Sequence, residues 1–408
     1  MLAALIPLFD GQMAVRGYSV FAQKQNYLKS PSYSGVARLD GAGNIPGFDI
    51  IDSMGMETLS GDLEIFVEAN NVSLFADIPH QCHEDHGKIV LLIDKSVEPT
   101  DMYIDRLKQL KEMGYKLAIR KLIGADFENY REIIKFMDYI LINHHKLDIS
   151  KARNYFEKVY PNLKICAVEV DTREDFDKLA EDGHYDLYEG EFFRMPVTEG
   201  VKEIAPLTTT YIELLNVVNK PDFDLTDAAD VIGHDTALVI SLLGMVNRMT
   251  VNAGVSSVRH AAAMLGQKEL KKWINTAITK EMCQDKPSEL TRISLLRARF
   301  AENLGGVFGL RGDDTAELFL MGLFSVLDKI LDMPMEEAIT KVKVSKDIQD
   351  ALLRGEGRLA HVYDFLLAYE DASWQEVSRQ MIVLGIEMEP VYDAFKDSLS
   401  WYRKLIPA

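Results

Sequence analysis

Short apolar runs alternate with amphipathic stretches along the first half of the chain. The strand-like runs cover 88–94, 115–119, 139–143 and 164–170. The helical stretches that follow them cover 101–113, 127–136, 149–159 and 173–181. Apolar runs that recur about every 25 residues, with helices between them, are typical of βα units around a parallel sheet. Gly114 and Gly183 stand where helix C-caps belong. The pattern predicts a (β/α) barrel of the TIM type, with 1–9 as its buried first strand.

After Leu207 only helical spacing remains. The predicted helices cover 211–218, 225–232, 237–246, 270–279, 290–308, 315–331, 346–353, 361–369, 374–384 and 390–406. Residues 24–63 are rich in Gly, Ser, Pro and Asn and predict loops with one short helix, and 195–206 predicts a linker. We therefore expect two domains, a barrel over 1–200 and an all-α helical bundle over 207–408.

Composition narrows the function classes. The chain has 408 residues and a formal net charge of −18, which argues against a broad surface for nucleic acid or for an anionic membrane. Cys82, Cys166 and Cys283 lie far apart, a usage that fits a reducing compartment. The apolar first nine residues lack a basic flank and are too short to span a membrane. We expect a cytoplasmic protein.

Five segments of the first half resemble, in order, the EAL family of cyclic di-GMP phosphodiesterases. They are GYSVFAQ at 17–23, VEP at 97–99, GYKLAI at 114–119, CAVEVDT at 166–172 and YDLYEGEFF at 185–193. The first lies where the family has its Glu-Ala-Leu strand, and the last resembles the closing strand that normally ends Gln-Gly-Tyr-Phe-Phe. The resemblance implies an EAL-like barrel.

The second half resembles the HDOD domain, a relative of the HD hydrolases that generally lacks their metal ligands. The matching segments are 217–221, 231–238, 242–247, 255–261, 265–266 and 319–328. An EAL-like barrel before an HDOD domain is a known architecture of bacterial signal-transduction proteins. The two resemblances together imply a protein of that kind.

EAL chemistry uses two divalent metals that carboxylates hold at the carboxyl ends of the strands. The resemblance places the family's site positions at Ser19, Glu68, Leu92, Lys95, Arg120, Lys121, Leu141, Asn143, Val168, Asp171 and Glu189. Asp171 keeps a carboxylate, Glu68 falls near an expected asparagine, and Glu189 replaces a glutamine. The other positions have lost the family's residue. We therefore expect no catalytic residues, no bound metal and no cofactor.

The change to Arg120 and Lys121 carries most weight, because the family has paired aspartates there. Like charges about 4 Å apart repel by roughly 4 kcal/mol at moderate screening, and no compensating glutamate is evident nearby in the sequence. Either these two residues bind an anion such as cyclic di-GMP without metal, or they form salt bridges inside a closed barrel mouth. We favour salt bridges, because Ser19 and Leu141 have replaced the motif glutamate and lysine.

One histidine-containing motif suggests hydrolase chemistry. His234-Asp235 resembles the HD dipeptide, but 322–328 better matches the segment that would hold it, and Ser325 and Val326 stand there. We interpret Asp235 as a helix N-cap.

Two further histidine groups are candidates for function, the first of them for metal binding. His80, Cys82, His83 and His86 are ligand types that zinc accepts. No second ligand cluster lies near them in sequence, and a solvated loop or helix is favoured. His144-His145 directly follows a predicted strand at the barrel mouth.

The favoured hypothesis is a catalytically inactive signalling protein, related to cyclic di-GMP signalling, that works as a protein-interaction scaffold. Its partners would be other signalling proteins, with self-association left open. The alternative is a metal-independent sensor of cyclic di-GMP or another nucleotide. An active cyclic di-GMP phosphodiesterase is the third hypothesis.

Overall fold

A computed structural model of the chain describes residues 1–24, 26, 43–147, 153–194, 206–220, 223–233, 235–249, 255–284 and 288–406. The chain forms two compact units. The first contains 1–195 together with 367–408, and the second contains 196–366. The boundary falls within helix α17 (Ala360–Glu370).

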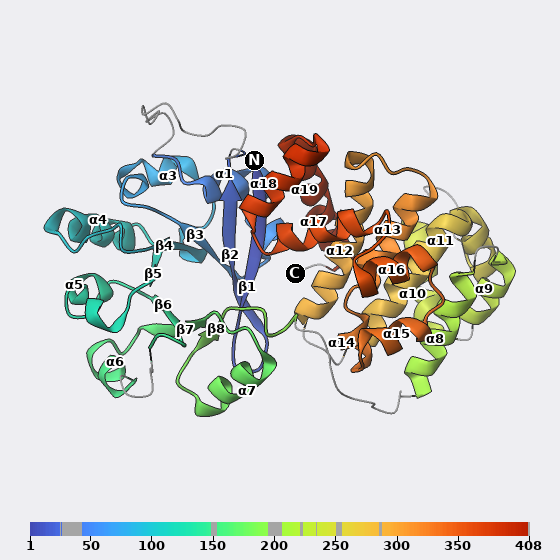
Figure 1. Cartoon of the computed structure of the whole chain (residues 1–408), viewed down its shortest axis with the longest axis horizontal. Helices are drawn as coiled ribbons and strands as arrows, with labels where there is room; N and C mark the ends of the chain where they lie inside the picture. The colour runs from blue at the N-terminus through green and yellow to red at the C-terminus, as the bar shows by residue number, and fades with distance from the viewer. Residues whose placement is uncertain are drawn as a thin grey trace. The chain divides into compact units, whose positions relative to one another are not determined.

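The first unit is built on a closed barrel of eight strands in chain order (Figure 1). The strands are β1 (Leu2–Phe9), β2 (Val15–Gln23), β3 (Glu64–Glu68), β4 (Ile89–Ile93), β5 (Lys116–Arg120), β6 (Tyr139–Asn143), β7 (Lys164–Val168) and β8 (Leu187–Tyr188). β1 runs antiparallel to both β2 and β8, and the remaining pairs are parallel. The carboxyl ends of β2 to β8 therefore share one rim. The predicted barrel is confirmed.

Helices surround the barrel, as the alternating pattern predicts (Figure 1). They are α1 (Pro46–Met54), α2 (Met56–Leu59), α3 (Ile78–Gln81), α4 (Asp101–Glu112), α5 (Arg131–Ile134), α6 (Arg153–Val159) and α7 (Arg173–Asp182). The helix predicted over 127–136 is reduced to α5, because 3₁₀ and turn conformations occupy 124–130. Within the stretch 24–63, the described residues 43–63 form two short helices instead of the one predicted, since Gly55 (φ 78°) breaks the helical path between them.

Apolar side chains fill the barrel interior. The buried cluster consists of Leu8, Phe66, Val90, Leu92, Ala118, Tyr139, Leu141, Cys166 and Leu187. The interior is therefore a packed core, as in other barrels of this kind, and chemistry has to take place at a rim.

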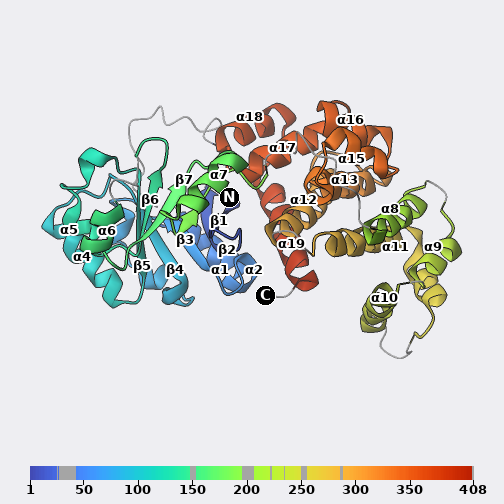
Figure 2. The same ribbon diagram turned by 90° about the horizontal axis from the view of Figure 1, so that it is seen from below.

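The C-terminal segment packs against the barrel. Helix α19 (Met388–Leu405) contacts β1 and α2, and helix α18 (Trp374–Leu384) precedes it (Figure 2). The hydroxyl of Tyr369 accepts a hydrogen bond from the backbone N–H of Ala3 at 3.1 Å. The Gln23 amide nitrogen donates to the Ser378 hydroxyl at 2.9 Å. The observed division thus differs from the predicted helical domain of 207–408, because the last helices bury their apolar faces on the barrel.

The second unit is all helical in the part that the structure describes (Figure 2). Before α17 it contains α8 (Pro206–Val218), α9 (Leu225–Ile232), α10 (Thr236–Met249), α11 (Val258–Met282), α12 (Ser288–Val307), α13 (Asp313–Phe324), α14 (Leu327–Leu331), α15 (Met335–Lys341) and α16 (Lys346–Arg354). The predicted bundle is confirmed. The single helix predicted over 315–331 is two, α13 and α14, and α15 was not predicted from the sequence.

Two local predictions of the second unit can be compared with the structure. Asp235 caps α10, since its Oδ1 accepts a hydrogen bond from the Leu238 N–H at 3.0 Å. His234 lies outside the described residues. Within α11 the helix breaks at Gly266, whose φ of 73° favours glycine. A Cβ on Gly322 would lie 2.3 Å from the Arg297 carbonyl oxygen, so α12 and α13 approach as closely as only glycine permits.

All three cysteines are buried, and none of them forms a disulfide. Among the described residues, no helix combines the length and the apolar character needed to span a bilayer.

Candidate functional site

The positions that resemble the EAL site lie at the carboxyl rim of the barrel or just inside it. Leu92 and Leu141 are buried in the barrel core, and Val168 packs against the same cluster. Hydrocarbon therefore occupies places where the family has charged groups. Such surroundings offer a hard cation no oxygen ligand.

Arg120 and Lys121, at the end of β5, both form ion pairs at this rim. The Arg120 guanidinium pairs with the Glu68 carboxylate and lies 5.8 Å from the centre of the Phe21 ring. Lys121 Nζ lies 3.3 Å from Asp94 Oδ2. The expectation that no carboxylate compensates these two cations was wrong, because the ends of β3 and β4 bring Glu68 and Asp94 to the same rim as the end of β5.

Glu189, just after β8, faces the barrel interior beside Ser19 of β2. The Ser19 hydroxyl donates a hydrogen bond to Glu189 Oε2 at 3.2 Å. Burial raises the pKa of Glu189, and the Ser19 hydrogen bond and the Arg120 charge partly oppose this. Burial likewise lowers the pKa of Arg120, and Glu189 opposes that shift. The two groups therefore support each other's charged form in a poorly solvated place.

Gly190 fixes the position of this glutamate. A Cβ at Gly190 would lie 2.0 Å from the Val170 carbonyl oxygen. No side chain fits there, so the end of β8 lies directly against the chain that leaves β7.

The rim also contains two non-glycine residues in the left-handed region, Lys121 (φ 63°) and Glu169 (φ 60°). This conformation costs about 1–2 kcal/mol for an L-residue. The Glu169 carboxylate accepts a hydrogen bond from the Asn143 amide. Asp171, the carboxylate that matches the family, is exposed, and Lys95 pairs with Asp126 away from these contacts.

Sequence reasoning missed two rim residues, Asp94 and Glu169. The available signal was their position, since Asp94 closes the run 88–94 and Glu169 lies within 164–170. Acidic residues at the ends of parallel strands meet at one rim. Among the described residues, however, the EAL-like positions do not bring three carboxylate or imidazole ligands within coordinating distance of one another.

Among the described residues, His80, Cys82, His83 and His86 do not come together as a set of metal ligands. Cys82 is buried, and burial raises its pKa to about 11. His86 stacks on the Tyr115 ring with centroids 4.3 Å apart, and His80 Nδ1 lies 2.9 Å from Asp77 Oδ2. These contacts engage the cluster's side chains separately, in the end of α3 and the loop after it, which favours the loop-or-helix interpretation of 80–86 over a zinc site.

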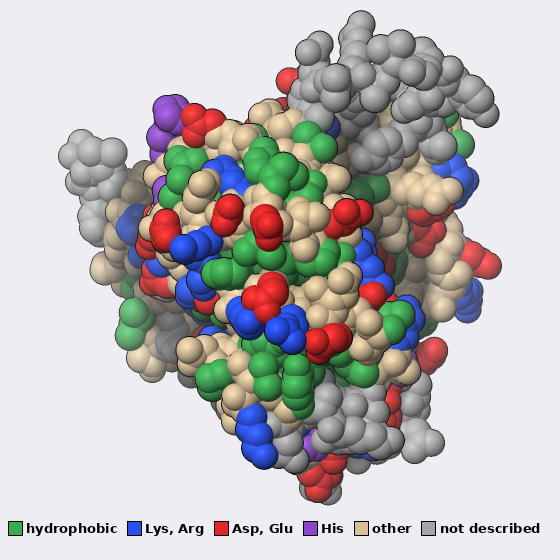
Figure 3. Space-filling view, turned by 90° about the vertical axis from the view of Figure 1, so that its left-hand side faces the viewer, with side chains coloured by type: hydrophobic (Ala, Val, Ile, Leu, Met, Phe, Trp, Pro, Cys, Tyr) green, Lys and Arg blue, Asp and Glu red, His purple; other side chains and the backbone are tan. Residues whose placement is uncertain are grey.

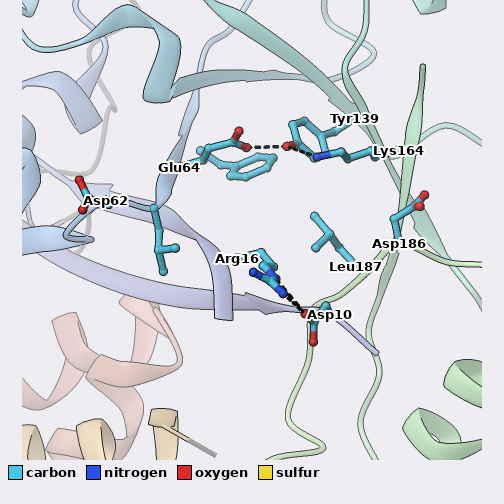
Figure 4. A pocket seen from close by; sticks show the side chains of 10 residues that line it. Asp10, Arg16, Asp62, Glu64, Tyr139, Lys164, Asp186 and Leu187 are labelled. Carbon is cyan, nitrogen blue, oxygen red and sulfur yellow. Dashed lines mark hydrogen bonds and ion pairs between the residues drawn. The ribbon is translucent and has the colours of Figure 1, made fainter. Parts of the chain in front are cut away.

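A pocket of about 490 Å³ opens at the opposite, amino-terminal end of the strands (Figure 4). Its polar side chains bind one another. The Tyr139 hydroxyl donates to Glu64 Oε2 at 2.5 Å, and Lys164 Nζ donates to the Tyr139 hydroxyl at 3.3 Å. Burial and Glu64 raise the pKa of Tyr139. This end of a (β/α) barrel typically serves stability, so the pocket is not our candidate.

The position that resembles the HD dipeptide lies between α13 and α14. The Ser325 hydroxyl donates to the Gly322 carbonyl at 2.7 Å, and Arg297 donates to Ser325 Oγ at 3.2 Å. Val326 is 1% exposed. This position is part of the buried core of the helical unit.

The barrel face that carries α4 and α5 mixes charges of both signs (Figure 3). On α5 and just before it, Arg131 pairs with Glu128 and Lys135 pairs with Glu132. The basic side chains described there are thus neutralised locally, which disfavours polyanion binding on this face.

The HDOD domain family matches residues 204–349. Cyclic di-GMP phosphodiesterase CdgJ of Vibrio cholerae is 25% identical over 354 residues, which cover 86% of this chain and 81% of CdgJ. Uncharacterized protein YuxH of Bacillus subtilis is 25% identical over 369 residues, covering 87% and 88%. A solved structure of a standalone EAL protein from Vibrio cholerae O395 matches at 15% identity and a TM-score of 0.36, covering 50% of this chain and 95% of that one.

The sequence prediction of a barrel followed by an HDOD domain is confirmed, since eight strands close into a barrel and the HDOD family matches 204–349.

Proposed function

We propose that this EAL-like and HDOD protein takes part in cyclic di-GMP signalling without hydrolysing the nucleotide, and that it acts by binding other proteins. The link to cyclic di-GMP rests on its relative CdgJ, which is named as a cyclic di-GMP phosphodiesterase. The absence of hydrolysis rests on the residues of this chain.

The observation that carries the proposal is the pair of cations at the end of β5. Arg120 and Lys121 engage Glu68 and Asp94 in ion pairs. A divalent ion placed here would have to displace these ion pairs, and its repulsion from a cation about 4 Å away is roughly 4 kcal/mol per unit charge at moderate screening. The Glu68 and Asp94 carboxylates are already engaged. These contacts support the loss of a two-metal mechanism at this rim.

Exposed apolar side chains on the helical unit support a role in protein binding. Ile240 and Met249 on α10 are 67% and 68% exposed, and Met264 on α11 is 48% exposed. Contiguous apolar patches mark surfaces that receive a partner, and we infer that these side chains contribute to one, since methionine adapts to different partner shapes.

The test is calorimetric titration of the full-length protein with cyclic di-GMP, with and without Mg²⁺, with the product pGpG assayed in the same samples. We expect no Mg²⁺-dependent product. Formation of product at a rate that follows Mg²⁺ would overturn the proposal and establish a phosphodiesterase.

The same titration tests the nucleotide-sensor alternative, which one observation favours: the Lys121 side chain is 61% exposed. Metal-independent binding that disappears in Arg120→Glu with Lys121→Glu would support a sensor. Arg131→Glu with Lys135→Glu is the matched control, because it makes the same charge change on α5. If both double variants behave like the wild-type chain, the rim does not bind the nucleotide.

A further inference from the structure

We propose that His144, His145 and Asp175 bind one transition-metal ion at the carboxyl rim of the barrel. Each offers one ligand atom, and these atoms lie within 4.8 Å of one another. The two histidines directly follow β6, and Asp175 lies in the first turn of α7, after β7. Because β6 and β7 are parallel neighbours, the fold brings the two loops together. None of the three is an EAL-like position, so the site is independent of the proposed function.

His144 is held in the orientation that a metal ligand needs. Its Nδ1 lies 3.2 Å from the Val168 carbonyl oxygen. A carbonyl only accepts hydrogen bonds, so this contact places the proton of the neutral ring on Nδ1 and the lone pair on Nε2. Nε2 is buried and has no hydrogen-bond partner in the structure. Metal-binding histidines characteristically show this arrangement of one anchored and one free nitrogen.

Asp175 is held in a similar way. The Thr172 hydroxyl donates to Asp175 Oδ2 at 2.8 Å and accepts from the Asp175 N–H at 3.1 Å. This reciprocal contact fixes the carboxylate and leaves Oδ1 for a ligand. His145 is exposed, and its ring centroid lies 3.8 Å from that of His144. It supplies the mobile member of the set.

The donor set selects the class of metal. Two imidazole nitrogens and one carboxylate oxygen suit Zn²⁺, Co²⁺, Ni²⁺ and Cu²⁺, whereas Mg²⁺ and Ca²⁺ require oxygen ligands. Tetrahedral coordination at about 2.0–2.1 Å sets ligand atoms about 3.3 Å apart. Rotation of the exposed His145 side chain can close the difference from the observed spacing. Three protein ligands leave the fourth position to water.

The experiment is calorimetric titration of chelator-treated full-length protein with Zn²⁺, followed by Co²⁺ absorption spectroscopy. We expect one saturable equivalent of Zn²⁺ and the visible bands of tetrahedral Co²⁺. His145→Ala and Asp175→Asn should each weaken Zn²⁺ binding by about ten-fold or more, in the range typical of losing a ligand or its support. Zn²⁺ should also raise the Tm of the wild-type chain but not that of His145→Ala.

The control is His80→Ala with His83→Ala, which removes two exposed imidazoles from the same unit. It should bind Zn²⁺ like the wild-type chain. Since His145 is exposed, its substitution does not threaten folding. The proposal would be overturned if the wild-type chain had no stoichiometric Zn²⁺ site. It would also be overturned if His145→Ala and Asp175→Asn bound Zn²⁺ as tightly as the wild-type chain.

Discussion

The two places where family resemblance points to lost chemistry differ in how the space is now filled. At the barrel rim, Arg120 and Lys121 form ion pairs that water still reaches, since the Glu68 and Lys121 side chains are 45% and 61% exposed. Between α13 and α14, Ser325 and Val326 are part of a buried core.

The difference indicates how readily each position would accept the family's residues again. Ion pairs at a solvated rim contribute little to stability, so the rim tolerates exchange of charge. A buried core does not tolerate a new charge, because desolvation costs several kcal/mol without a partner. We therefore expect restoration of the family's aspartates to be tolerated at Arg120 and Lys121, and restoration of the HD dipeptide to destabilise the helical unit.

The largest expected effect follows from placing the HD dipeptide where the resemblance locates it. Ser325→His with Val326→Asp should destabilise the protein by about 3–5 kcal/mol, because a carboxylate would be buried beside apolar helices. The measurement is urea-induced unfolding followed by circular dichroism. Val326→Leu, which keeps the site apolar, serves as control. An unfolding midpoint equal to that of the wild-type chain would show that the site is open to solvent and would break the comparison.

A smaller effect is expected at the rim. Arg120→Met with Lys121→Met removes both ion pairs and should cost about 1–2 kcal/mol, because both pairs are partly exposed while the loss of Arg120 also leaves the buried Glu189 without its cation. The same urea experiment measures it, with Arg131→Met and Lys135→Met as the matched exposed pair on α5. If the free energy of unfolding fell as much as in Ser325→His with Val326→Asp, the rim residues would also belong to the buried core.

The smallest effect concerns pH. The folded-state pKa of Glu189 is raised by burial, so the unfolded chain ionises this group first as pH rises. Its contribution to stability therefore falls from the unfolded pKa, about 4.3, up to the folded pKa. Glu189→Gln, which still accepts a hydrogen bond from Ser19, should gain stability relative to the wild-type chain between pH 4 and pH 8. Thermal unfolding of both proteins at pH 4 and pH 8 measures this gain. If the stability difference between Glu189→Gln and the wild-type chain were the same at both pH values, Arg120 would fully compensate the Glu189 charge.

Much of this architecture could be predicted from the sequence. Hydrophobic periodicity located β4 to β7 and most helices, because each element buries one regular face. It could not place 367–408, since an amphipathic helix shows that it has a buried face but not which surface covers it. The rim pairs escaped prediction for a related reason: Glu68 and Arg120 meet through the barrel register, while 52 residues separate them in the chain.

In the sequence, the second unit is inserted between the two segments of the first, and this order affects synthesis of the chain. The barrel unit begins with β1 and ends with α19, which packs on β1, while 196–366 lies between them in sequence. A ribosome adds roughly 5–20 residues per second, so β1 waits on the order of ten seconds or more for the helix that covers it. During that interval the inserted helical unit can fold first, and the surface awaiting α19 is exposed to chaperones. In this protein the first strand made is among the last to be covered.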